Sequence, residues 1–148
     1  MITDNYIIAQ IGKAAVIGTA IVFSVNIVCL IVSYAVIKNQ EPSGITQLMT
    51  IILGIIAIVD IGAAFFLKKQ LLMPVLKYDA PPTEDYLSQI ILKITIIVSS
   101  LCAAPAIYGL AAVFFGAKTE VMAGFVISSL AGFMLLRLRP RDFKNLIK

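Results

Sequence analysis

The sequence has no histidine, no tryptophan and only two cysteines among its 148 residues. Cys29 and Cys102 are far apart along the chain, so they do not have the spacing of a zinc-ligand pair. The sequence also contains no glycine-rich phosphate loop and no nucleophile beside a plausible base. These absences argue against an enzyme, and we expect neither a metal nor another cofactor.

Charge is scarce as well: charged residues make up 14% of the chain and hydrophobic residues 60%. Four apolar stretches, at 14–37, 42–67, 94–117 and 121–136, contain a single charge, Asp60. A helix of about 24 residues is roughly 36 Å long, which is enough to cross about 30 Å of hydrocarbon. The sequence therefore predicts an all-α integral membrane protein, one domain with transmembrane helices at about 10–37, 44–67, 87–116 and 120–137.

The basic residues are unevenly distributed between the two sides that four alternating helices would define. Of the twelve lysines and arginines, only Lys38 and Lys118 fall on one side. The positive-inside rule then predicts that both termini, the connection 68–86 and the basic tail 138–148 are cytoplasmic, with the chain multi-pass in the cell (inner) membrane. This topology explains the positive charge, so we expect no nucleic acid as a partner. The tail is expected to bind anionic lipid, with an acidic partner as the alternative.

The chain resembles itself at an offset of 80 residues. Residues 3–6 (TDNY) match 83–86 (TEDY), and the same shift places Lys13 on Lys93 and Lys38 on Lys118 without a gap. We interpret this as two repeated helical hairpins in parallel orientation, helices one and two followed by helices three and four. The alternative is chance combined with a shared membrane composition.

Residues 103–110, with the sequence AAPAIYGL, resemble the ion-carrying helix of the proteolipid ring subunits of rotary ATP synthases and vacuolar ATPases. In that family a carboxylate lies five residues before the tyrosine of a similar run, and four-helix members consist of two duplicated hairpins. Here the carboxylate position is Ala103, and the glycine ladder of the partner helix is absent. The resemblance implies a proteolipid-like plan, but it transfers no ion-binding residue to this chain.

Small and polar residues indicate where helices pack within the bilayer. Gly124, Ser128 and Gly132 recur every four residues on one face of the fourth predicted helix, which predicts close helix packing there. Pro105 removes a helical hydrogen bond and should kink the third helix; a hinge or an ion-binding notch is the alternative reading. Asn26 is expected to form an interhelical hydrogen bond rather than to bind a ligand.

Asp60 is the most informative polar residue, because an unpaired acid in a membrane helix costs at least a few kcal/mol. If the second helix ends at Lys68, Asp60 lies about 12 Å inside that end. Lys93 and its repeat counterpart Lys13 are then at similar depths, which predicts a structural ion pair with Asp60. A proton or ion relay and a partly hydrated acid are the alternatives.

The function that follows is a non-catalytic multi-pass membrane subunit or scaffold that packs into a larger membrane assembly. Small-residue faces are plentiful and intramembrane polar groups are few, which favours packing over transport. The expected partners are the lipid bilayer and either other membrane subunits or further copies of the chain. The alternative is a small, proteolipid-like conductor of protons or ions that uses Asp60.

Overall fold

The computed structural model describes residues 4–37, 44–77 and 83–143, and these residues form an all-helical bundle. Four α-helices follow one another along the chain: α1 (Asp4–Ile37), α2 (Gly44–Lys77), α3 (Glu84–Phe114) and α4 (Thr119–Leu136). A short 3-10 helix, η1 (Pro140–Phe143), ends the described part. Each of the four α-helices is long and apolar enough to span a membrane, as their hydropathy predicted.

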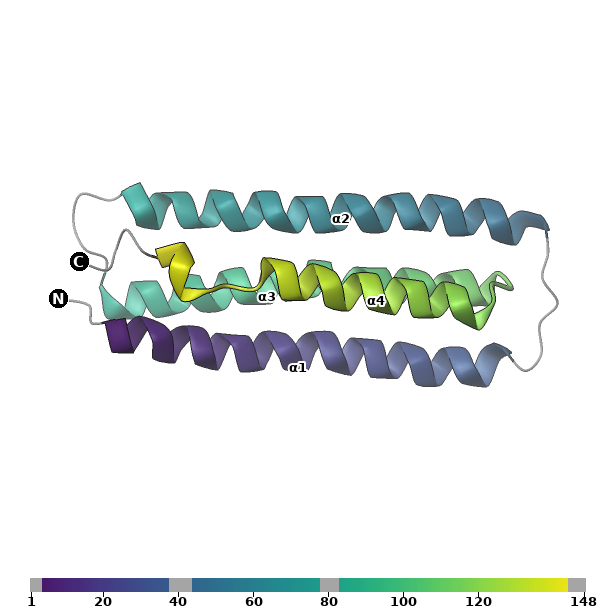
Figure 1. The fold of residues 1–148 in the computed structure, drawn as a ribbon, viewed down its shortest axis with the longest axis horizontal. Coiled ribbons are helices and arrows are strands. Elements are labelled where there is room, and N and C mark those ends of the chain that lie inside the picture. Colours follow the sequence, from purple (N-terminus) through teal and green to yellow (C-terminus); the bar gives the residue numbers. More distant parts are fainter. Residues whose placement is uncertain (1–3, 38–43, 78–82, 144–148) are drawn as a thin grey trace.

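The helices alternate in direction, so that α1 and α3 are parallel to each other and antiparallel to α2 and α4 (Figure 1). Bonds between α1 and α3 show the parallel register: the Tyr6 hydroxyl donates to the Glu84 carbonyl at 3.1 Å, and Ser88 donates to Gln10 at 3.4 Å. The start of α1 and the segment η1 therefore lie at the same end of the bundle. We call this end the basic end, because most described lysines and arginines lie near it, namely Lys13, Lys68, Lys69, Lys93, Arg137, Arg139 and Arg141.

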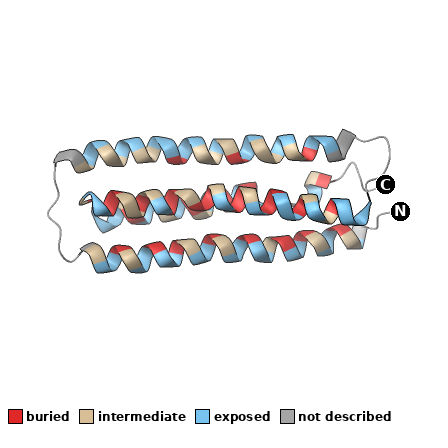
Figure 2. Ribbon diagram, turned by 180° about the vertical axis from the view of Figure 1, so that it is seen from behind, coloured by how far each residue is buried: buried red, intermediate tan, exposed pale blue. Residues whose placement is uncertain are grey.

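Helix α3 is the centre of the bundle, since it packs against α1, α2 and α4. In the described part of the chain, α1 and α2 hardly touch each other, and they lie on opposite sides of the α3–α4 pair (Figure 1). Buried residues accordingly follow one face of each outer helix, whereas they are dense along α3 (Figure 2). Helix α2 is the least buried of the four, so most of its apolar surface faces outward.

Glycines allow the closest helix contacts. A Cβ atom at Gly109 of α3 would lie 2.7 Å from Phe125 Cβ of α4, and one at Gly18 of α1 would lie 2.6 Å from Ser99 Oγ of α3. These two positions accept no larger side chain without a shift of their neighbours. The turn between α3 and α4 also needs glycine, because Gly116 has a φ of 90°.

The helix boundaries differ from the expected ones mainly at the basic end. Helix α2 does not end at residue 67 but continues through Lys68 and Lys69 to Lys77, with Pro74 inside it. Its last turns are held by packing, because Leu72 is buried in the same core cluster as Leu87 and Ile91 of α3. Lysine is a good helix former, so a lysine pair alone does not terminate a helix. The expected connection 68–86 is therefore mostly helical in its first half.

Candidate functional site

Asp60 lies at the middle of α2, between the helix ends at Gly44 and Lys77. Its Oδ2 atom accepts a hydrogen bond of 2.5 Å from the hydroxyl group of Tyr108 on α3, and the contact is partly buried. Tyr108 packs against the apolar cluster that contains Ala57, which lies one turn before Asp60 in α2, so apolar side chains adjoin this hydrogen bond. A phenolic hydroxyl group can donate a hydrogen bond to a carboxylate, so Tyr108 serves as the hydrogen-bond donor to Asp60 here.

The expected ion pair between Asp60 and Lys93 or Lys13 is not formed among the described residues, where both lysine side chains are exposed. The reason is the register of α2 on α3. Because Asp60 is opposite Tyr108, Lys93 lies fifteen residues earlier in α3, which is about 22 Å along the helix axis toward the basic end. Ending α2 at Lys68 instead of Lys77 accounts for about half of this difference, and the axial offset between α2 and α3 accounts for the rest.

Tyr108 is the functional candidate that sequence reasoning missed. It appeared there only within the proteolipid-like run 103–110 and was not connected to Asp60. Matching α2 and α3 outward from their connection does not bring the two residues to one level, because Asp60 lies 17 residues before Lys77 whereas Tyr108 lies 24 residues after Glu84, a difference of about 10 Å. The sequence signal of Tyr108 was therefore weak, a single tyrosine within an apolar run.

A long groove lies between α2 and α4, on the side of α2 away from Asp60. This α2–α4 groove has a volume of about 540 Å³, and residues 50–61 of α2 and 121–128 of α4 line it. Gly54 stands on one wall and Gly124 on the other, and no atom comes within 4 Å of the Cβ position at either glycine. Small residues thus face open space here, in contrast to the close contact at Gly109.

The structure divides the small-residue face expected on α4. Gly132 is buried against α2, where a Cβ would lie 3.3 Å from Ile61 Cδ1. Gly124 and Ser128 are exposed and line the α2–α4 groove instead. The Ser128 hydroxyl donates to the Gly124 carbonyl at 2.9 Å, so its hydrogen-bonding need is met within α4 and it can face an apolar phase. The contact at Ile61 closes the α2–α4 groove toward the basic end.

Two other predicted residues lie inside the bundle. The Asn26 amide of α1 donates to Ser129 Oγ of α4 at 2.9 Å and to the Val22 carbonyl at 2.7 Å, which confirms the expected interhelical bond. Pro105 is buried within α3, which continues through it from Glu84 to Phe114. A kink or hinge at Pro105 stays a prediction.

Comparisons with protein-family models, with curated proteins and with solved structures find no match to this chain. The proteolipid resemblance and the internal repeat therefore stay predictions from the sequence. Helix α2 carries both Asp60 and one wall of the open groove.

Proposed function

We propose that this chain is a non-catalytic, multi-pass membrane subunit that packs into a larger assembly through the α2–α4 groove. The observation that carries the proposal is the open groove itself, with Gly54 and Gly124 facing each other's helix across unfilled space. Glycine is less favourable than alanine in a helix interior, by about 1 kcal/mol in soluble hosts. A glycine in a helix is therefore best explained where a neighbouring helix comes too close for a side chain. A further membrane helix, from another subunit or a second copy, would supply that neighbour.

The lining of the groove supports the same proposal. Exposed apolar side chains of α2 form its wall, among them Ile51, Ile55 and Ile58. Such a surface is compatible with either lipid or protein, but the glycines and Ser128 favour a helix backbone as the occupant because they permit close approach.

The membrane orientation belongs to the proposal as well. Most described lysines and arginines lie toward the basic end, whereas Lys118 lies at the opposite end. By the positive-inside rule, the basic end faces the cytoplasm and the chain resides in the cell (inner) membrane. Both termini are then cytoplasmic.

The proposed assembly is tested by mild-detergent purification of the full chain, with cross-linking of a cysteine introduced at Ile58. Gly124→Leu and Ser128→Leu should each abolish the cross-linked product, because leucine fills the space that the neighbouring helix occupies. Gly12→Leu is the matched control, since Gly12 of α1 is also open but does not line the groove.

Cross-linking to the same protein in wild type and Gly12→Leu, but not in the two groove variants, supports assembly through this face. A wild-type chain that gives no cross-linked product in membranes, or groove variants that cross-link normally, would show that lipid fills the groove. Mass spectrometry of the product separates a second copy of this chain from another subunit.

A proton conductor is the second candidate, and the Asp60–Tyr108 hydrogen bond at the middle of the bundle is the observation that favours it. An intramembrane carboxylate is a group from which proton relays are built. Proton flux into liposomes containing the wild-type chain should then exceed that of empty liposomes and disappear in Asp60→Asn. Flux equal to that of empty liposomes would eliminate this candidate.

A further inference from the structure

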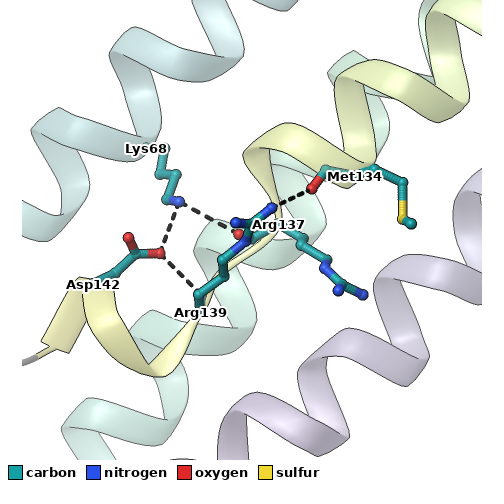
Figure 3. A network of polar contacts seen from close by, with 5 residues as sticks. All are labelled: Lys68, Met134, Arg137, Arg139 and Asp142. Carbon is teal, nitrogen blue, oxygen red and sulfur yellow. Dashed lines mark hydrogen bonds and ion pairs between the residues drawn. The ribbon is translucent and has the colours of Figure 1, made fainter.

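The segment after α4 folds back over the basic end of the bundle. Phe143 of η1 is fully buried, in the core cluster that also contains Ile7 and Leu87. Polar contacts fix the same segment: Lys68 Nζ lies 2.8 Å from Asp142 Oδ2, and this oxygen accepts a bond of 2.9 Å from the Arg139 amide (Figure 3). Part of the region expected to be a basic tail is thus a built element of the fold.

This arrangement creates a second groove, again between α2 and α4 but at the basic end. This basic groove has a volume of about 400 Å³, and its walls combine two kinds of residue. Lys69 of α2 and Arg141 of η1 are exposed cations at the groove. Apolar side chains continue from them along the bundle, namely Phe65, Leu72, Met73 and Leu135.

The charges at the basic groove do not cancel. Asp142 is the acid that lines it, and it is paired with Lys68, whose ammonium group also donates to the Arg137 carbonyl at 3.5 Å (Figure 3). Within the described part of the chain, Lys69 and Arg141 form no ion pair. Two unneutralised cations therefore stand beside an apolar wall.

We propose that the basic groove binds an anionic phospholipid, with the phosphate group between Lys69 and Arg141 and an acyl chain along Phe65, Met73 and Leu135. Lysine and arginine both bind phosphate, arginine through its planar fork and lysine as a point charge. A soluble phosphate compound would use the cations but not the apolar wall. Basic pockets between helix ends at the cytoplasmic surface are suited to acidic head groups.

The proposal rests on the proposed insertion of the bundle in a membrane but not on assembly through the α2–α4 groove. The two grooves are separate, because Ile61 packs against Gly132 between them. A failure of one proposal is therefore visible without a failure of the other.

The test measures the thermal unfolding of the full chain in mild neutral detergent while phosphatidylglycerol, phosphatidylcholine or deacylated glycerophosphoglycerol is added. We expect phosphatidylglycerol alone to raise the unfolding midpoint. Lys69→Gln together with Arg141→Gln should weaken this binding by about fivefold for each cation, roughly 25-fold for both. Lys118→Gln is the matched control, since it removes an exposed cation at the opposite end.

A second pair of changes, Lys144→Gln with Lys148→Gln, tests the end of the chain as the source of binding. Loss of the phosphatidylglycerol effect in this pair but not in the groove pair would overturn the proposal. Equal effects of the three compounds, or an equal loss in Lys118→Gln, would overturn it too. The comparison requires that the groove variants unfold at the wild-type midpoint without lipid. If they do not, cross-linking of phosphatidylglycerol to a photoreactive residue at Leu135 replaces it. The absence of a cross-linked adduct would then refute the site. A chain that is not recovered in the membrane fraction would instead refute insertion.

Discussion

The hydrogen bond between Asp60 and Tyr108 gives the sharpest prediction from this structure. If this bond is the main polar interaction of Asp60, the two residues should be energetically coupled, and Asp60 and Lys93 should not be. The experiment is a pair of double-mutant cycles, one combining Asp60→Leu with Tyr108→Phe and the other combining Asp60→Leu with Lys93→Met. Leucine is used because its side chain has the same number and branching of heavy atoms as aspartate and makes no hydrogen bond.

The expected coupling follows from the kind of bond and its surroundings. A hydrogen bond to a charged group contributes about 1.5–3 kcal/mol to the stability of a soluble protein. Between membrane helices, measured couplings average about 0.6 and reach about 1.7 kcal/mol, because the unfolded chain in the membrane finds other partners. The contact between Asp60 and Tyr108 is partly buried, so we expect a coupling of about 1–2 kcal/mol. For Lys93, about 22 Å away along α3, we expect a coupling near zero.

The assay is reversible unfolding in detergent, followed by helical circular dichroism for the wild type, the three single variants and the two double variants. Additive effects of Asp60→Leu and Tyr108→Phe would contradict the hydrogen bond as a stabilising contact. A coupling of 1 kcal/mol or more between Asp60 and Lys93 would contradict the register of α2 on α3 and restore the intramembrane ion pair.

Three further predictions address packing, the folded-back end and topology. Gly109→Ala should destabilise the bundle by about 1–3 kcal/mol, since its Cβ would lie 2.7 Å from a neighbouring carbon, whereas Gly124→Ala should not destabilise the isolated chain and should stabilise it by up to about 1 kcal/mol; thermal unfolding checks both, and equal effects would contradict the packing. Asp142→Asn removes an ion pair whose side chains are only 14% and 21% exposed, so limited proteolysis should cut the C-terminal segment faster than in the wild type. A cysteine at Thr119 should react with an external reagent and one at Asn145 should not; labelling at Asn145 would reverse the topology.

The helices themselves were predictable because long uncharged runs leave few alternatives. The four helices and their order follow from hydropathy, and α3 and α4 end close to the expected residues. Helix α1 begins at Asp4 instead of about residue 10, and the largest difference is at the end of α2, where hydropathy falls at Lys68 but the helix continues. There the structure depends on contacts that are distant in sequence, namely Leu72 with the first turns of α3 and Lys68 with Asp142.

The candidate sites were less predictable for the same reason. Asp60 is recognisable in the sequence as the single charge within the four apolar stretches, but its partner depends on the register of two helices, which the sequence does not define. Likewise, small-residue spacing identified Gly124, Ser128 and Gly132 without indicating which of them would meet a helix of this chain. The tail was described by its charge alone, so the burial of Phe143 was not expected.

The polar contacts of α2 explain why the α2–α4 groove is a stable feature rather than the result of a loosely attached helix. Thr46 donates to the Phe115 carbonyl near one end of α2, Asp60 is bonded to Tyr108 at its middle, and Lys68 is paired with Asp142 toward the basic end. Polar contacts at three levels define both the depth and the rotation of α2 against the rest of the bundle, because a shift of α2 would break them. These contacts hold α2 in a position that leaves the groove open beside α4. In the proposed assembly, a partner helix would occupy the space at Gly54 and Gly124 with little rearrangement.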